Sequence, residues 1–300
     1  MAPLFLEGEG GGLAAVAYVA RPSRWPLSQW ATIHCDALPA CPDVVAALRP
    51  LEETLRGHGG VDLSLGSFAA PATVELAPHG YAETRRLEFV LGLDGGLDAV
   101  YRGFRKTQRH EIRKFEGSGA VCVDAGDAAS IDWFCSIEAA TVERHRAQGK
   151  GYACTSRRTL ELLWEEVVRT GRGRAYFALR EGVAVSTAVV GICGPRLYLL
   201  YSGSTPDGFS IHASKGLLWH VMNQEYDRGV RECNLGGVPP GSSAPDSVDH
   251  GLYRFKQGFG GVERVCISGQ KVLRPAAARC REALSWIRSL LRPNRAQQAS

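Results

Sequence analysis

The chain has 300 residues, of which 45% are hydrophobic, so it can bury the core of one large domain or of two smaller ones. Its formal net charge is only +4, which excludes a protein that coats nucleic acid through bulk charge alone. The 9 cysteines include no CxxC pair, so the sequence predicts reduced thiols rather than a disulfide framework or a zinc site. No segment approaches the ~20 apolar residues of a membrane span, and we expect a soluble, cytoplasmic monomer.

The first hundred residues alternate strand-like runs with loops. Residues 13–20, 61–68 and 84–93 predict strands. Asp43 is a suitable N-cap for a helix whose apolar residues recur at helical spacing. Pro50 lies inside this helix and is expected to kink or split it.

Residues 99–119 predict one basic amphipathic helix. Its apolar stripe consists of Tyr101, Phe104, Ile112 and Phe115. The cations on another face are Arg102, Arg105, Lys106, Arg109 and Arg113. Such a face can simply be solvated, can grip the pyrophosphate of a nucleotide sugar or lipid, or can hold tRNA phosphates. The residues alone do not separate the last two interpretations.

The second half predicts two helices, begun by Ser130 and by Thr155 or Ser156, and then an antiparallel meander of strands at 174–181, 183–193 and 196–204. A helix over 214–228 follows. Strands over 231–237 and 262–268 flank a loop that carries "GLYRFKQGFGG" (251–261). A last helix over 276–291 would pack through Leu284, Ile287 and Leu291.

This order of meander, loop, helix and strand resembles the core of a GNAT acyltransferase. In that core the helix N-terminus faces the acyl donor, and its free N–H groups suit a phosphate. The loop before the helix offers only Lys215-Gly216 in place of the glycine-rich loop that coenzyme A-binding members use. The sequence therefore predicts a weak or missing pyrophosphate grip, or an ordinary capped helix with a surface lysine.

A more specific resemblance rests on five segments in order: "YRGFRKTQRHEIRKFEGSG", "LYLLYSGS", "SKGLLWHVMNQEYDRGV", "CNLGGV" and "GLYRFKQGFGG". Together they resemble the Fem-type (FemABX-like) branch of the GNAT superfamily and the related CelD-like acetyltransferase domains. The resemblance implies an α/β fold of two GNAT-like domains, with mixed sheets flanked by helices. We assign these domains to 1–124 and 125–273, with 274–300 as a helix and tail that pack back on the first.

The resemblance also implies that Phe255 and Lys256 match the family's catalytic Phe-Lys pair. The chemistry supports such a lysine independently, because attack of an amine on an ester builds an oxyanion that an ammonium in apolar surroundings stabilises. We expect a substrate-binding set of Tyr201, Asn234, Gly236, Gly237, Tyr253 and Lys215. Tyr201 is equally well explained as a core residue, and Lys256 as a solvated lysine at a loop edge. No general base is evident, with Asp246, Asp249 and Glu111 candidates by position only, and no metal site is expected.

By resemblance, the expected function is amide-bond formation, with an aminoacyl group passing from aminoacyl-tRNA to an amine on a peptide-like or amino-sugar-linked acceptor. Arg105, Lys106, Arg109 and Arg113 would bind the phosphates of the donor, and no bound cofactor is expected. One alternative is an N-acyltransferase that uses acyl-coenzyme A. Another is a protein that kept the fold, lost the chemistry and binds an anionic ligand or RNA.

Overall fold

The computed structural model describes residues 2–7, 13–20, 29–33, 44–57, 59–65, 75–149 and 157–291. Its contacts divide the chain into two compact units, Met1–Leu87 with Arg264–Ser300, and Glu88–Glu263. The two boundaries fall inside strands β5 (Ala82–Gly92) and β11 (Val262–Val272). These units divide the chain differently from the predicted domains, because residues 88–124 have their contacts with the second unit.

The first unit is a sheet covered by helix α1 (Val44–Gly57). Its strands are β1 (Ala2–Glu7), β2 (Leu13–Ala20), β3 (Gln29–Ile33) and β4 (Gly60–Leu65), and β4 pairs with the end of β11. The β1–β2 and β2–β3 pairs are antiparallel, and β3 and β4 are parallel. Helix α9 (Pro275–Leu291) contacts β4, and a short 3₁₀ helix (Ala77–His79) precedes β5.

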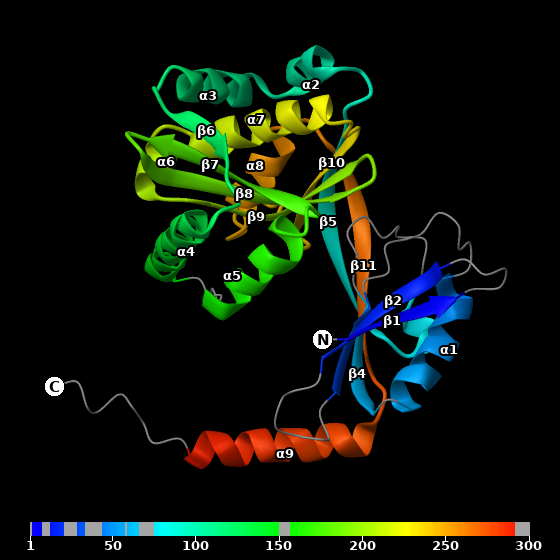
Figure 1. Ribbon diagram of the computed structural model, residues 1–300. Coiled ribbons are helices and arrows are strands. Elements are labelled where there is room, and N and C mark those ends of the chain that lie inside the picture. Colours follow the sequence, from blue (N-terminus) through cyan, green and yellow to red (C-terminus); the bar gives the residue numbers. More distant parts are fainter. Residues whose placement is uncertain are drawn as a thin grey trace. The chain divides into compact units, whose positions relative to one another are not determined.

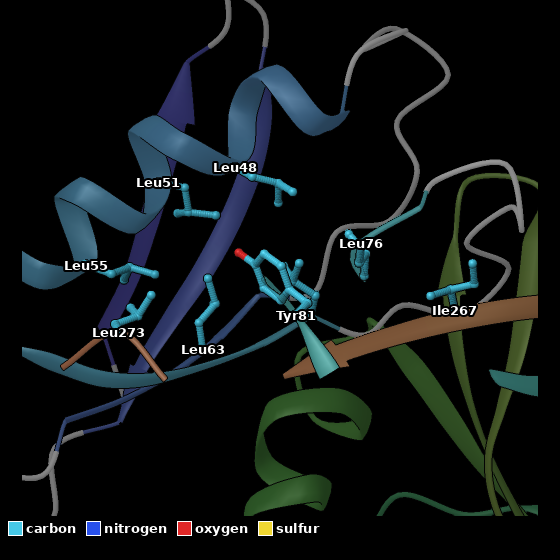
Figure 2. Close-up of a cluster of buried hydrophobic side chains, with 9 residues drawn as sticks. Leu48, Leu51, Leu55, Leu63, Leu76, Tyr81, Ile267 and Leu273 are labelled. Atoms are coloured by element: carbon cyan, nitrogen blue, oxygen red, sulfur yellow. The ribbon is translucent and has the colours of Figure 1, made fainter. Parts of the chain in front are cut away.

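Leucines from one face of α1 form the core of this unit (Figure 2). Leu48, Leu51 and Leu55 follow one another at steps of three and four, which places them on the same side of the helix. They pack with Leu63 of β4 and with Tyr81, both buried. Pro50 lies on the exposed side, and α1 continues through it, so the expected split of this helix was wrong.

The second unit is built on strands β6 (Val121–Asp124), β7 (Gly173–Arg180), β8 (Val183–Cys193), β9 (Arg196–Ser204) and β10 (Glu232–Val238). The predicted meander is confirmed: β6 to β9 pair antiparallel in order, and β10 pairs parallel with β9. Helices α4 (Ala128–Ala147) and α5 (Arg157–Leu163) cover one face, and α7 (Ala213–Asp227) covers the other (Figure 1). A π-helical turn (Trp164–Val168) continues α5, and α6 (Pro206–Ser210) precedes α7.

Strands β9 and β10 pair over only three residues of each. The pairing joins Glu232 to Arg196 and ends at Asn234 opposite Tyr198. Beyond that point β9 continues to Ser204 along β8, while β10 continues to Val238 without pairing to β9. The two strands therefore separate at Asn234.

Two sequence predictions about helices were wrong. The basic segment forms two helices, α2 (Leu97–Gly103) and α3 (Lys106–Glu116), because Phe104 and Arg105 between them have extended backbone. The segment "GLYRFKQGFGG" is not a loop: its first part belongs to α8 (His250–Gln257).

The N-cap of α4 is Asp127, whose side chain accepts a hydrogen bond from the Ser130 N–H at 3.0 Å, rather than Ser130 itself. The predicted caps Asp43, Thr155 and Ser156 lie outside the described residues, as do the side chains of Leu284, Ile287 and Leu291.

Candidate active site

Helix α8 holds Lys256 inside the second unit. The side chain has 7% of its surface exposed, although it carries an ammonium group. Its Nζ donates a hydrogen bond of 2.8 Å to the carbonyl oxygen of Gly237, near the end of β10. A lysine ammonium has three N–H donors, so this contact leaves two for another acceptor. The solvated lysine that the sequence also allowed is excluded by this burial.

A buried carboxylate accompanies Lys256. Glu88, in β5, is fully buried, and its Oε2 accepts a hydrogen bond of 2.8 Å from Nδ2 of Asn234. Oδ1 of Asn234 in turn accepts from the N–H of Gly236 at 2.8 Å. Asn234 therefore fixes both Glu88 and the backbone that leads to the Gly237 carbonyl.

Burial and the nearby carboxylate act on the Lys256 ammonium in opposite directions. Burial is the larger effect and lowers the pKa of Lys256 to about 8, while the negative charge of Glu88 raises it. At neutral pH the ammonium form therefore still dominates, and a buried ammonium beside a buried carboxylate is the arrangement that avoids an isolated charge.

Glu88 is a residue that the sequence analysis missed. The available signal was a lone acidic residue within the apolar run "LEFVLGL" of a predicted strand. Acidic side chains are seldom fully buried without a partner, so an acidic residue at this position could have been interpreted as a buried carboxylate with a polar partner.

Tyr253 and Phe255 extend the site along α8. The Tyr253 hydroxyl donates to Oε1 of Glu263 at 2.7 Å, and this hydrogen bond is the main reason that the pKa of Tyr253 is raised. Its ring meets Phe89 edge to face, with centroids 5.5 Å apart. Phe255 packs in the same manner on Phe259, at 5.6 Å.

The glycines that follow α8 allow the backbone there to approach other elements of the second unit closely. A methyl group at Gly258 would lie 2.5 Å from Oε1 of Gln108, in α3. Gly260 has φ +73°, in the left-handed region that favours glycine, and a methyl group there would lie 2.6 Å from the Gly103 carbonyl oxygen. The motif is thus shaped by contacts with α2 and α3.

The first turn of α7 is covered by α3. The ring of Phe115 occupies the space beside Gly216, where a methyl group would lie 1.9 Å from Cδ1 of Phe115. Lys215 forms an ion pair with Glu111, which also lies 3.7 Å from Nδ1 of His212. The Glu111 carboxylate therefore supplies negative charge at this helix terminus, as the helix dipole favours.

The predicted phosphate-binding cations lie on or beside α3. Arg105, Lys106 and Arg113 are exposed, and they form no ion pair with any residue in the described part of the chain. Arg109 is half-buried, and its Nη1 donates to the Arg102 carbonyl at the end of α2, at 2.8 Å. Arg109 thus joins the two helices.

Tyr201 lies in a different cluster from Lys256. Its hydroxyl donates to Oε2 of Glu138 in α4, and its ring meets Phe134 edge to face at 4.6 Å. Phe134 belongs to the core between α4 and the sheet, against which Tyr201 packs. The structure therefore brings together Lys256, Asn234, Gly236 and Gly237, but it does not add Tyr201 to them.

The candidate general bases have ordinary surroundings. Asp246 is exposed, Asp249 precedes α8 without capping it through its side chain, and Glu111 is paired with Lys215. Among the residues that the structure describes, no group of three or more His, Cys, Asp and Glu side chains is arranged to hold a metal ion. Nor does any helix in the described ranges have the length and apolar character needed to span a membrane.

Solved structures share this fold at low sequence identity. A crystal structure of FemX superposes with a TM-score of 0.69 at 13% identity, covering 93% of this chain and 89% of that chain. The C-terminal domain of a putative lysylphosphatidylglycerol synthetase from Agrobacterium fabrum gives 0.57 at 14% identity, covering 94% and 88%. A tandem GNAT protein from the clavulanic acid biosynthesis pathway gives 0.50 at 15% identity, covering 89% and 81%.

No curated protein matches the sequence. The family model described as "Acetyltransferase (GNAT) domain" matches residues 102–257, which is more than half of the chain. The matched segment runs from α2 through Lys256 and includes the separated strands β9 and β10. The chain therefore belongs to the GNAT acetyltransferase family, with the fold of FemX, and is an acyltransferase.

Proposed function

We propose that the protein forms an amide bond by transferring an aminoacyl group from aminoacyl-tRNA to an amine on a peptide-like, cell-wall-precursor or natural-product acceptor. The observation that carries the proposal is the buried Lys256 ammonium at the Gly237 carbonyl, where β10 has separated from β9. In this proposal the acyl group lies against the sheet at the point where the two strands separate.

The reaction is an attack of the acceptor nitrogen on the carbonyl carbon of the donor ester. The new C–N bond forms first, and the carbonyl oxygen becomes an oxyanion. The C–O bond to the tRNA ribose then breaks, and the proton lost by the nitrogen ends on the ribose oxygen. The two N–H groups of Lys256 that Gly237 leaves free would stabilise the oxyanion, and the apolar surroundings would strengthen that interaction. Asn234 and Glu88 would hold this geometry.

The donor is inferred from the first turn of α7. Acyl-coenzyme A would need this turn for its pyrophosphate, but Phe115 fills the space beside Gly216 and Glu111 pairs with Lys215. The exposed Arg105, Lys106 and Arg113 supply the positive surface that nucleic-acid phosphates need. The names of the similar structures, FemX and lysylphosphatidylglycerol synthetase, support aminoacyl transfer. We place the reaction in the cytoplasm, where charged tRNA is available.

A second candidate is an N-acyltransferase that uses acyl-coenzyme A. The match to an acetyltransferase domain and the separated β9 and β10 favour it. It requires α3 to move away from the first turn of α7, since Phe115 and Glu111 occupy that region.

A donor screen separates the two candidates. The purified chain is incubated with amine acceptors and either charged tRNAs or acyl-coenzyme A thioesters, and product masses are recorded. We expect an aminoacyl mass increase that ribonuclease treatment of the donor abolishes. A product formed only from acyl-coenzyme A, with acetyl-coenzyme A raising the Tm of the protein, would overturn the tRNA proposal. Lys256→Met should slow the formation of either product by about 10²–10³, while Arg158→Ala, at an exposed position of α5, should not.

A further inference from the structure

The start of helix α9 is fixed to the first unit. The backbone N–H groups of Leu273 and Arg274 both donate to the carbonyl oxygen of Val61 in β4, at 2.8 and 3.1 Å. Ala278, in the first turn, is buried, and α9 contacts β4 (Figure 1). These contacts hold the helix at its first turn. Beyond Ala278, the side chains of α9 that the structure describes are all exposed: Arg279, Cys280, Glu282, Ala283 and Trp286.

The sequence of α9 makes it an amphipathic helix. Residues three or four positions apart lie on the same side of a helix. One row at such steps consists of Cys280, Leu284, Ile287 and Leu291, and the row beside it contains Ala283, Trp286 and Leu290. A third row, which consists of Arg281, Ser285 and Arg288, is polar. An apolar face and a cationic face therefore run along the same helix.

The apolar face of α9 meets water at the positions that the structure describes. Ala278, which is buried, comes two positions before Cys280, which is exposed, so these two residues lie on opposite sides of the helix. Ala283 is also exposed, and Trp286 has 65% of its surface exposed. An exposed tryptophan on an apolar face indicates a surface that binds a partner.

The charge of this segment indicates which partner it fits. Residues 274–295 contain six arginines and one glutamate, a formal charge of +5, whereas the whole chain carries only +4. All other residues together therefore carry a charge of −1. Such a segment is complementary to an anionic surface. A symmetric pair of α9 helices from two copies of the chain would bring two cationic segments together, which repel each other.

We propose that α9 binds the surface of an anionic lipid bilayer. The helix lies in the plane of the membrane, with its apolar rows at the boundary of the acyl chains and its arginines at the lipid phosphates. Trp286 lies beside Arg279 at the edge of the apolar face, which suits a ring that is apolar but carries a polar N–H. Arginines recur along all 17 residues of α9, so the helix lies on the bilayer and does not span it.

Membrane binding of this kind is reversible. A single amphipathic helix holds a protein through a limited apolar area and through its attraction to anionic lipids, and salt weakens that attraction. The inference goes beyond the proposed function, because it concerns the surface on which the enzyme is held and not the group that it transfers. It can therefore fail while the donor screen succeeds, and the reverse also holds.

Sedimentation of the full chain with lipid vesicles tests the proposal. One set of vesicles consists of phosphatidylcholine alone, and the other contains equal parts of phosphatidylcholine and phosphatidylglycerol. We expect the chain to sediment with the anionic vesicles and to be released from them by added salt. Equal binding to both kinds of vesicle, or binding to neither, would overturn the proposal.

Two pairs of variants locate the binding surface. Trp286→Glu should weaken binding to the anionic vesicles by at least about tenfold, because it places a carboxylate at the acyl boundary. Val183→Glu is its control, since Val183 is exposed to a similar extent, 66%, at the start of β8. Arg288→Glu should weaken binding by at least about fivefold, while Arg158→Glu in α5 should not. Equal losses within either pair would contradict a site on α9.

Tryptophan fluorescence reports the depth of the helix directly. The chain has 6 tryptophans, so the contribution of Trp286 is taken from the difference between the unmodified chain and Trp286→Phe. Trp286→Phe should still bind anionic vesicles, because it keeps an aromatic ring, but the blue shift of the emission on binding should disappear. An unchanged shift in this variant would place a different tryptophan in the lipid and would overturn the proposal.

Sedimentation equilibrium without lipid distinguishes the other possible occupant of the apolar face. We expect the unmodified chain and Trp286→Glu to have the same mass. If the unmodified chain formed a dimer that Trp286→Glu dissociated, and neither bound vesicles, the apolar face would be an interface between two copies and the proposal would be wrong.

Discussion

The phenyl ring of Phe115, in α3, occupies the space that a side chain at position 216 of α7 would need, so Gly216 and Phe115 bring the two helices into close contact. The contact places α3 over the first turn of α7. Gly216, which stands where coenzyme A-binding members have a glycine-rich phosphate loop, is thus explained by the packing of α3 on α7.

Substitution Gly216→Ala should destabilise the second unit by about 1–3 kcal/mol, because an added methyl group overlaps the Phe115 ring. Urea unfolding followed by circular dichroism measures the change. Gly103→Ala is the matched control, since nothing lies within 4 Å of a methyl group there. Equal stability of the two variants would show that α3 does not pack on α7 in this way.

Substitution Lys256→Met should lower kcat by about 10²–10³, because it removes the donor assigned to the oxyanion. It also leaves Glu88 without the nearby positive charge, which should lower stability. The double variant Lys256→Met with Glu88→Gln should recover stability but not activity. Recovery of both by the double variant would mean that Lys256 has only a structural role.

The depressed pKa of Lys256 predicts how stability depends on pH. Between about pH 8 and the ordinary lysine value of 10.5, the unfolded chain binds a proton that the folded chain does not. Stability should therefore rise with pH across this window, by up to about 3 kcal/mol at 1.36 kcal/mol per pKa unit. Unfolding curves from pH 7 to 10.5 for the unmodified chain and for Lys256→Met check the sign. The variant should lack this rise.

Substitution Tyr201→Phe should lower stability by about 1–3 kcal/mol, because the buried Glu138 loses the hydroxyl that donates to it. We expect KM and kcat to change little, since Tyr201 packs with Phe134 rather than with the Lys256 cluster. A large rise in KM at unchanged stability would restore the substrate-orienting role that the sequence suggested.

The sequence by itself determined the order of elements in the second unit. The meander β7–β8–β9, the helix α7 and the strand β10 follow from hydrophobic periodicity and turn residues, which are local properties. Lys256 could also be singled out from the sequence, because a cation among aromatic residues and glycines is unusual along the chain.

Only the tertiary structure decided the partners of these residues. Glu88 and Asn234 are 146 positions apart, and Lys215 lies 104 positions from Glu111, so no local pattern could pair them. The break between α2 and α3 and the helical form of α8 likewise follow from packing, which overrides local preference. The Arg105 N–H donates to the Gly258 carbonyl, which joins the start of α3 to the end of α8, and these two segments are about half the chain apart. Local sequence thus determines most of the elements, whereas burial and hydrogen bonding between distant segments determine where these elements break and which side chains meet.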